Sequence, residues 1–386
     1  MDISKISKLE LLEKCKELGI TKCNSKNKSQ LINLIKGKNE VVEECKIILS
    51  NEEIPLQNKQ IIMNDTKILN VIDLFCGCGG MSKGLTDAGL NVIAGIDIWD
   101  KAVESYNKNN NHPAYCYDLT ELPPEKFNEL YNKENKIVDI LVGGPPCQSF
   151  SIAGKRDKND PRNALFMEYV KYLDYFKPKA FIMENVIGML SKKTTSGENV
   201  IDIIMNQLER NYNCIINKLY ASDFEVPQNR RRTIIIGIRK DINIIPKEVE
   251  PIIKSVEDRI PVKNILIPIE EIDKKYYLSE KALTGIANKK IVNKKKGFGF
   301  GAQMLNFDKP SYTIPARYWK DGYDALVKYN EKEIRRLTIT ELKRIQSFPD
   351  NYIITGSNKD VIMQIGNAVA CKFAYYLGKY IINTLQ

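Results

Sequence analysis

The stretch that decides the fold is DLFCGCGGMSKG, residues 73–84. It ends the apolar run 68–75, which predicts a buried strand, and it opens a segment with helical spacing. Glycines between a strand and a helix let a ligand approach the backbone beside the positive end of the helix. Ser82 stands where a G-x-G-x-x-G fingerprint requires its third glycine, so the loop suits a nucleotide-bearing cofactor better than a dinucleotide.

Downstream of this loop, strand and helix patterns alternate. The predicted strands span 68–75, 92–97, 137–142, 180–184, 214–221 and 232–238, and the helices between them include 163–176 and 200–210. This alternation predicts an α/β fold with a doubly wound, mainly parallel sheet. Residues 241–324 carry Pro, Lys and Gly with little period, and regular patterns return at 331–346 and 361–382.

Composition limits the class of protein. The 386 residues, 43% hydrophobic and 27% charged, are ordinary for a globular protein with room for two domains. Neither a membrane-spanning run nor the apolar core of a secretion signal is present, so we expect an intracellular protein without membrane attachment. Nine cysteines, a sparse and odd set, indicate a reducing compartment. The single histidine, His112, argues against a metal site, and the formal charge of +10 suits a polyanionic partner.

Residues 1–40 form a small lysine-rich unit. Helical spacing runs over 7–18, where Gly19 is a stop signal, and again over 28–35. The pair resembles a SAP-type helix-extended-helix module, a family that binds DNA, and a generic helical hairpin is the alternative. Residues 41–66 are polar and are predicted to be a linker.

A second informative stretch is GGPPCQSFS, residues 143–151, which follows the predicted strand 137–142. Its prolines and glycines favour a fixed turn. A thiol at that turn projects from the carboxyl end of a strand, where open α/β sheets bind ligands. A buried, inert cysteine is the alternative interpretation of Cys147.

Residues at the ends of neighbouring strands suit an adenosine. Asp97 ends the second strand, where an acidic side chain can accept hydrogen bonds from ribose hydroxyls. Trp99 offers a flat face for an adenine, and Asp118, after a third predicted strand, can accept from an adenine amino group.

Five motifs in one order, from about residue 68 to the C-terminus, resemble those of the C5-cytosine DNA methyltransferases. They are DLFxGxGG (73–80), GPPCQxFS (144–151), ENV (184–186), QNRRR (228–232) and GNAV (366–369). In addition, RLT (336–338) with Glu341, Arg344 and QSFPD (346–350) resembles the penultimate motif of that family.

The resemblance implies an S-adenosyl-L-methionine-dependent methyltransferase with a Rossmann-like sheet. In such an enzyme Cys147 would attack C6 of a cytosine, and Glu184 would protonate or hydrogen-bond N3. Arg232 would contact O2 of the base, and Arg230 would help to fix the base and Cys147. Because C5 and C6 cannot be reached inside the base stack, the cytosine would be flipped out of double-stranded DNA.

The resemblance also implies a cofactor site in which Phe75 and Trp99 enclose the adenine. The residues expected to contact the cofactor are Phe75, Gly77, Gly79, Asp97, Ile98, Trp99, Asp118, Leu119, Pro145 and Asn367. Asp97 stands where the family usually has glutamate, and Tyr117 precedes Asp118 where it often has glycine. Neither departure removes a functional group.

The expected organisation is a SAP-like module at 1–40, a linker at 41–66, a catalytic and cofactor-binding domain at 67–240, a target-recognition domain at 241–354, and a C-terminal helix at 355–386 that returns to the catalytic domain. The stretch 289–301 combines lysine, glycine and aromatic residues, which predicts a groove-contacting loop; a flexible lysine-rich loop is the alternative.

We expect a monomer that binds double-stranded DNA, with a cognate restriction endonuclease acting on the same sequence. An RNA (tRNA) cytosine-5 methyltransferase and an inactive DNA-binding regulator are the alternative functions.

Overall fold

The computed structural model describes residues 7, 11, 27, 28, 31 and 32, and then 68–146, 161–194, 197–295 and 302–386. The chain divides into two compact units, Met1–Asp65 and Thr66–Gln386. In the first unit Leu11 and Leu31 are helical and fully buried, one in each of the two helices predicted there. The linker predicted at 41–66 lies outside the described residues, and the SAP-like resemblance stays a prediction.

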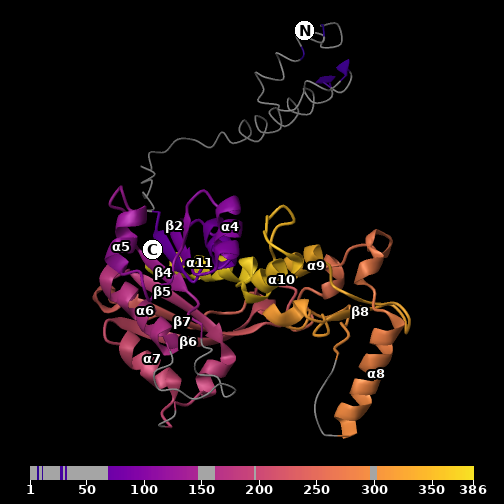
Figure 1. Cartoon of the computed structure of the whole chain (residues 1–386). Coiled ribbons are helices and arrows are strands. Elements are labelled where there is room, and N and C mark those ends of the chain that lie inside the picture. The colour runs from indigo at the N-terminus through magenta and orange to yellow at the C-terminus, as the bar shows by residue number, and fades with distance from the viewer. Residues whose placement is uncertain are drawn as a thin grey trace, which may run out of the picture. The chain divides into compact units, whose positions relative to one another are not determined.

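The second unit is built on a seven-stranded sheet with the order β3-β2-β1-β4-β5-β7-β6 (Figure 1). The strands are β1 Asn70–Leu74, β2 Asn91–Asp97, β3 Ala114–Cys116, β4 Ile140–Gly143, β5 Ala180–Val186, β6 Tyr212–Tyr220 and β7 Arg231–Arg239. Neighbours from β3 to β5 are parallel, and β7 is antiparallel to both β5 and β6. The doubly wound, mainly parallel sheet predicted from the sequence is therefore confirmed.

Helices cover both faces of this sheet (Figure 1). One face carries α3 (Gly80–Asp87) and α11 (Cys371–Leu385), whose apolar side chains share a core with β1, β4 and β7. The other carries α5 (Pro124–Tyr131), α6 (Pro161–Phe176) and α7 (Val200–Leu208). Helix α4 (Asp100–Asn109) packs Tyr106 against Cys76 and Ala114. Within the described ranges, no helix combines the length and apolarity needed to cross a membrane.

Two strand boundaries differ from the prediction. Strand β4 begins at Ile140 rather than at residue 137, and the side chain of Ile137 is 65% exposed. Strand β1 ends at Leu74 because Phe75 has a φ of 58°, a left-handed conformation that turns the chain out of the strand. Phe75 thus belongs to the loop after β1.

A second hydrophobic core lies apart from the sheet and includes Val262, Ile314, Tyr318 and Leu342. Strand β8 (Leu326–Lys328) and helix α9 (Ile339–Ile345) contribute to it, whereas α8 (Glu280–Lys295) and β9 (Ile334–Arg336) pack around a smaller core at Leu278. Strands β8 and β9 form an antiparallel pair, and α8 extends away from them in Figure 1, where it is orange.

Helix α8 corrects the prediction of little regular structure over 241–324. It also places 289–295 on a helix rather than in the predicted loop, whereas 296–301 lie outside the described residues. Among its described side chains, Ala282, Leu283 and Ile286 in the first half pack against a small core around Leu278. One and a half turns of apolar spacing are too short to give a clear helical period.

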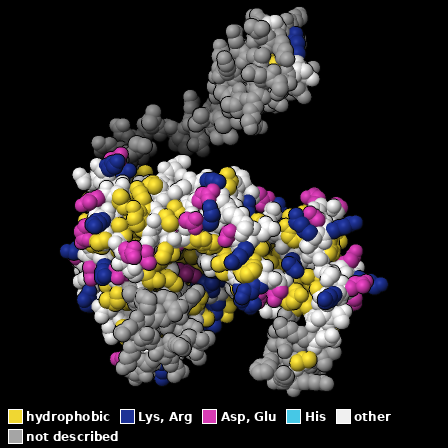
Figure 2. All heavy atoms as spheres, in the orientation of Figure 1, with side chains coloured by type: hydrophobic (Ala, Val, Ile, Leu, Met, Phe, Trp, Pro, Cys, Tyr) yellow, Lys and Arg dark blue, Asp and Glu magenta, His cyan; other side chains and the backbone are white. Residues whose placement is uncertain are grey.

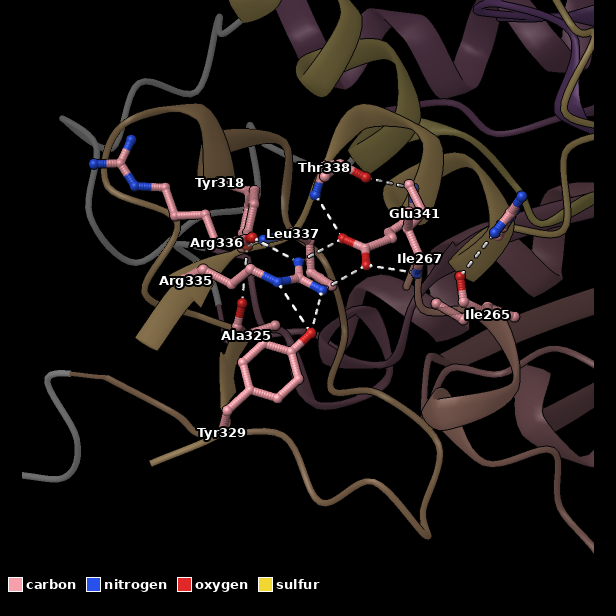
Figure 3. Close-up of polar contacts among 11 residues, drawn as sticks. Ile265, Ile267, Tyr318, Ala325, Tyr329, Arg335, Arg336, Leu337, Thr338 and Glu341 are labelled. Atoms are coloured by element: carbon pink, nitrogen blue, oxygen red, sulfur yellow. Dashed lines mark hydrogen bonds and ion pairs between the residues drawn. The ribbon is translucent and has the colours of Figure 1, made fainter. Parts of the chain in front are cut away.

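A buried ion pair joins β9 to α9 (Figure 3). Arg335 and Glu341 have fully buried side chains, and Arg335 donates from Nη1 and Nη2 to the two carboxylate oxygens at 2.8 Å each. The same oxygens accept from the backbone N–H groups of Thr338 and Ile267, and Thr338 Oγ1 caps α9. The Tyr329 hydroxyl accepts from Arg335 on the other side. The carboxylate thereby fixes the positions of Ile267 and of the start of α9 relative to each other.

The C-terminal segment holds two helices instead of the one predicted. Helix α10 (Asn358–Asn367) packs Val361 and Ile365 into the second core, whereas α11 packs into the core of the sheet. The chain bends at 368–370 because Gln346 Nε2 donates to the carbonyls of Ile365 and Ala368. These carbonyls therefore have a hydrogen-bond donor without the N–H groups of a further helical turn.

Candidate active site

The carboxyl ends of the parallel strands form one edge of the sheet. Strand β7 runs in the opposite direction, so its first residues lie at that same edge. The strand order therefore places the predicted residues side by side along it, in the sequence Asp118, Asp97, Phe75, Pro145, Glu184 and Arg232. Neighbouring strands are about 4.8 Å apart, so residues on adjacent strands can contact one ligand.

The glycine loop after β1 is tied to the end of β2. Asp97 Oδ2 accepts from the N–H of Gly77 at 2.8 Å, and Oδ1 accepts from the N–H of Trp99 at 2.9 Å. Each oxygen keeps a lone pair that can accept from a ribose hydroxyl. Burial raises the pKa of Asp97, and the backbone donors oppose that shift.

Two glycines in this loop leave room for close contacts, Gly77 for a ligand and Gly79 for the Tyr352 side chain. Gly77 has a φ of 54° and no atom within 4 Å of where a Cβ would lie, so the loop is open to a ligand there. Gly79 has a φ of 94°, and a Cβ on it would lie 2.6 Å from the Tyr352 hydroxyl. That hydroxyl donates to the carbonyl of Cys78 at 2.7 Å, which brings the segment after α9 onto the loop.

The other predicted cofactor residues lie at this edge with different exposures. Phe75 and Trp99 are half-buried, whereas Ile98 is 66% exposed. Asp118 Oδ1 accepts from the N–H and hydroxyl of Thr120, and Oδ2 accepts from no donor in the described part of the chain. The side chain of Leu119 packs in the main core instead of facing the edge, which leaves its backbone for a ligand.

Asn367 is exposed at the end of α10, and the residues after it contact the glycine loop. A Cβ on Gly80 would lie 2.2 Å from the carbonyl oxygen of Val369, a distance that excludes any side chain. The structure thus brings the last of the five motifs to the first.

The loop that carries Cys147 begins beside Glu184. Asn185 donates to the carbonyl of Pro145 at 2.9 Å, and a Cβ on Gly144 would lie 3.1 Å from Glu184 Oε2. Residue 144 can therefore approach the carboxylate because it is glycine. Cys147 itself lies outside the described residues.

Glu184 and Arg232 form an ion pair across β5 and β7. Arg232 Nε lies 2.6 Å from Glu184 Oε1, and the side chains are 12% and 13% exposed. Arg232 Nε lacks an aligned hydrogen bond, so the contact is electrostatic, while Nη1 donates to the carbonyl of Arg231. The pair presents a carboxylate and a guanidinium together at the edge of the sheet.

Arg230 is a buried cation with incomplete partners. It is 4% exposed, its Nη1 donates to the carbonyl of Ile314 at 3.4 Å, and its Nε has no partner among the described residues. Burial lowers the pKa of Arg230 to about 9, with a further contribution from Arg232. Because an unpartnered buried donor is costly, the site has unused hydrogen-bonding capacity for a ligand.

Two polar residues near this edge have roles that the sequence did not predict. Asp73 is buried beneath the glycine loop, and an acid inside the apolar run 68–75 was the signal for it. Gln228 is fully buried, and its amide hydrogen-bonds Gln346 and the N–H of Ile314. Nothing in the sequence marks Gln228 as buried, since it opens the polar run 228–232.

Comparison with known proteins agrees with this geometry. A family model described as C-5 cytosine-specific DNA methylase matches residues 69–383. Type II methyltransferase M.SsoII of Shigella sonnei is 34% identical over 84% of this chain and 82% of the relative. Type II methyltransferase M1.ScrFI of Lactococcus lactis subsp. cremoris is 33% identical over 89% of this chain and 84% of the relative. The solved structure of S. pombe Dnmt2 methyltransferase has the same fold, with a TM-score of 0.66, 21% identity, and coverage of 82% of this chain and 99% of that one.

The residues at the edge fit the cofactor of that family, because an open glycine loop and an acceptor carboxylate lie where a nucleoside would bind. The chain therefore belongs to the C-5 cytosine-specific DNA methylases, enzymes that transfer the methyl group of S-adenosyl-L-methionine to C5 of a cytosine in DNA.

Proposed function

We propose that Cys147 is the nucleophile of this methyl transfer and that Glu184, Arg230 and Arg232 hold the target cytosine. The observation that carries the proposal is the Glu184–Arg232 pair, which lies against Gly144 at the start of the cysteine loop. A base that enters there meets an acid at one atom and guanidinium donors at others.

The chemistry follows from the residue types. The Cys147 thiolate forms a bond to C6 of the cytosine, and the electron pair of the C5–C6 double bond moves into the ring. Glu184 donates a hydrogen bond or a proton at N3, and Arg232 donates to O2, so the negative charge of the ring is stabilised. S-adenosyl-L-methionine would supply, when bound, the methyl group that the activated C5 takes up, and would leave as S-adenosyl-L-homocysteine. Loss of the C5 proton then restores the double bond and expels Cys147 as thiolate.

Arg230 would complete the pocket for the base. Its Nε has no acceptor among the described residues. Its guanidinium is repelled by the charge of Arg232 and attracted by the charge of Glu184. We infer that the flipped cytosine or the cysteine loop supplies the missing acceptor. Arg230 then links base binding to Ile314 of the second core, whose carbonyl it already contacts.

The cysteines that the structure describes are poor nucleophiles. They are Cys76, Cys78, Cys116, Cys214 and Cys371, and desolvation raises the pKa of each of these thiols. A raised pKa keeps a thiol protonated and unreactive at neutral pH. Cys147 is the cysteine that the motif singles out, three residues after Gly144, which lies against Glu184.

We assign the cofactor to the edge formed by β1, β2, β3 and β4. Phe75 and Trp99 would hold the adenine, Asp97 the ribose, and Asp118 Oδ2 the adenine amino group. The backbones of Gly77 and Gly79 would face the methionine part, bordered by Pro145 and Asn367. Ile98 and Leu119 would contribute backbone contacts, since the Leu119 side chain lies in the core.

The remaining assignments concern specificity and partners. We infer that the described part of 241–330, including the lysine-rich α8, reads a specific sequence in double-stranded DNA. Residues 1–40 would add sequence-independent affinity through their lysines. The enzyme would act as a monomer alongside a restriction endonuclease for the same sequence, as part of a restriction-modification pair.

A covalent trap tests the nucleophile. Bisulfite sequencing of DNA from a host that expresses the chain identifies the methylated sequence, and a duplex with 5-fluorocytosine at that position is then prepared. Fluorine cannot leave as a proton does, so the wild-type protein should remain bound to the duplex under denaturing conditions. Cys147→Ser should lower turnover at least about 10³-fold and form no such complex.

Cys214→Ser is the matched control, because burial raises the pKa of the Cys214 thiol to about 12 and its side chain lies on β6, away from Glu184. It should trap like the wild type. Trapping by Cys147→Ser at the wild-type level would show that another residue is the nucleophile.

A further inference from the structure

An arginine beside the proposed catalytic pair has unused donors. Arg231 is exposed, is the first residue of β7 and lies directly opposite Tyr220, the last residue of β6. Its guanidinium carbon is 5.3 Å from the centroid of the Tyr220 ring. Apart from this stacking contact, the side chain makes no hydrogen bond or ion pair with any residue that the structure describes.

A second guanidinium stacks on the same ring but is neutralised. The guanidinium carbon of Arg259 lies 5.5 Å from the Tyr220 centroid, and Nη2 of Arg259 is 2.7 Å from Asp223 Oδ1. Both members of that ion pair are largely buried, with side chains 16% and 14% exposed. Two cations thus share one aromatic ring, and only Arg259 has a counter-ion within the described residues.

Arg231 lies at the edge of the sheet that carries the proposed site. Because side chains alternate along a strand, Arg232 points toward Glu184 and Arg231 points to the opposite face. Lys218, on the same face of β6 as Tyr220, is also exposed. Figure 2 shows Lys and Arg side chains gathered between the part that holds the sheet and the part that holds α8.

We propose that Arg231 binds a phosphate of the DNA backbone and that Tyr220 is the positioning residue that holds its guanidinium for this contact. A guanidinium offers a planar fork of donors that matches a phosphate in a bidentate geometry. Stacking on a ring limits the rotamers of the arginine before DNA arrives, which reduces the entropy lost on binding. The negative phosphate also offsets the repulsion between Arg231 and Arg259.

The proposal rests on DNA as the substrate and not on the role of Cys147. Binding of a short fluorescent duplex to the full chain should be measured across a salt series for the wild type and Arg231→Gln. Loss of one phosphate contact should make the negative slope of log K against log salt shallower by about 0.9. The ratio of wild-type to variant affinity should therefore shrink roughly threefold between about 50 and 200 mM salt. Affinity for S-adenosyl-L-methionine, measured in the same preparations, reports an intact fold.

Arg239→Gln is the matched control. Arg239 ends the same strand at the opposite edge of the sheet, where it is paired with Asp241. Its replacement removes the same charge and should leave the salt slope of the wild type unchanged. If Arg231→Gln and Arg239→Gln give the same slope, the effect comes from net charge and the proposed contact does not exist.

The role of Tyr220 is tested by two variants. Tyr220→Phe keeps the ring and should bind the duplex like the wild type, whereas Tyr220→Leu removes the stack and should weaken binding in the same direction as Arg231→Gln. In the double variant Tyr220→Leu/Arg231→Gln the two losses should not add, since both act on one contact. Full additivity, or a loss in Tyr220→Phe, would overturn the positioning role. The covalent trap of Cys147 is read separately, so its failure would leave this result interpretable.

Discussion

At the scale of single residues, a buried carboxylate lies under the glycine loop. Asp73 is 1% exposed and accepts a 2.6 Å hydrogen bond from the hydroxyl of Ser82. Ser82 also contacts the Tyr106 hydroxyl, which lies 2.8 Å from His112 Nε2. Ser82 therefore replaces the third glycine of a dinucleotide fingerprint because its hydroxyl satisfies Asp73.

The pH dependence of stability should report on Asp73. Burial raises its pKa from 3.8 to about 7, so the folded chain keeps a proton that the unfolded chain releases. The contribution of Asp73 to stability therefore falls as the pH rises through that window. Asp73→Asn cannot ionise, so it should not lose this stability as the pH rises. The difference in free energy of unfolding, variant minus wild type, should therefore be at least about 1 kcal/mol larger at pH 7 than at pH 4.

Urea unfolding at several pH values measures this difference. Asp258→Asn, at an exposed carboxylate with no ion pair among the described residues, is the matched control and should run parallel to the wild type. Parallel curves for Asp73→Asn and the wild type would mean that Asp73 ionises in the folded chain as it does in the unfolded chain.

Part of the site at this scale was predictable, and the reason is chemical. Asp97 and Pro145 end or follow strands and Glu184 lies two residues before the end of β5, and the parallel topology brings such residues to one edge. The incomplete partners of Arg230 were not predictable, because they depend on Ile314, which is distant in the sequence. The catalytic and cofactor roles of these residues stay predictions.

At the scale of elements, the start of α9 depends on one buried ion pair. Glu341 accepts four hydrogen bonds, two from Arg335 and two from backbone N–H groups (Figure 3). The exposed Arg336, which belongs to the motif quoted from the sequence, is not the partner; the alternation along β9 turns Arg335 inward. A buried pair of this kind costs most when one member alone is removed.

Glu341→Gln should therefore destabilise the protein by about 3–5 kcal/mol, because Arg335 would remain buried without its counter-ion. Chemical unfolding measures the loss. Arg336→Gln changes the neighbouring exposed arginine and should stay within about 0.5 kcal/mol of the wild type. The double variant Arg335→Met/Glu341→Gln should recover part of the loss; if it is as unstable as the sum of its single variants, the pair is not coupled.

Most strands of the sheet were predicted because they are short, mainly apolar runs separated by segments with helical spacing; β3, with three residues, is too short to give such a run. Helix α8 was missed since the described side chains that pack, Ala282, Leu283 and Ile286, span less than two turns, and lysines and asparagines interrupt the apolar spacing of its second half. The break between α10 and α11 was missed because it depends on Gln346, about twenty residues earlier in the chain. Gln346 Nε2 donates to the carbonyls of Ile365 and Ala368, which in a continuous helix would accept from N–H groups of the next turn. Contacts made at long range override local pattern in both cases.

At the scale of the whole second unit, a pair of buried amides joins the sheet to the second core. Gln228 Nε2 donates to Gln346 Oε1 at 3.0 Å, and Gln228 Oε1 accepts from the N–H of Ile314. The neighbouring backbone pairs too, since Asn229 N donates to the carbonyl of Ser311. Residues 311–314 thus hydrogen-bond directly to the QNRRR motif (228–232) and help to hold it in place.

The segment around α8 is attached differently. Leu278 N donates to the carbonyl of Ile334, and at the other end Leu326 N donates to the carbonyl of Gln303. Between these two anchors, the described residues of 279–302 contact β8 and β9 through the small core around Leu278, and none of them forms a hydrogen bond with residues 228–232. This segment can be replaced without touching 311–314.

Exchange of residues 279–302 for the equivalent segment of a related enzyme should therefore change the methylated sequence and preserve the chemistry. Base edges are read by a few side chains, each worth roughly 1–3 kcal/mol of discrimination, so a new segment brings a new code. Bisulfite sequencing of host DNA reports the code, and trapping on 5-fluorocytosine placed in the new sequence reports the chemistry. Lys294→Ala, a single change on α8, should weaken DNA binding without altering the sequence methylated. An active chimera that still methylates the original sequence would place recognition outside 279–302, and the segments 244–262 and 320–333 would be exchanged next.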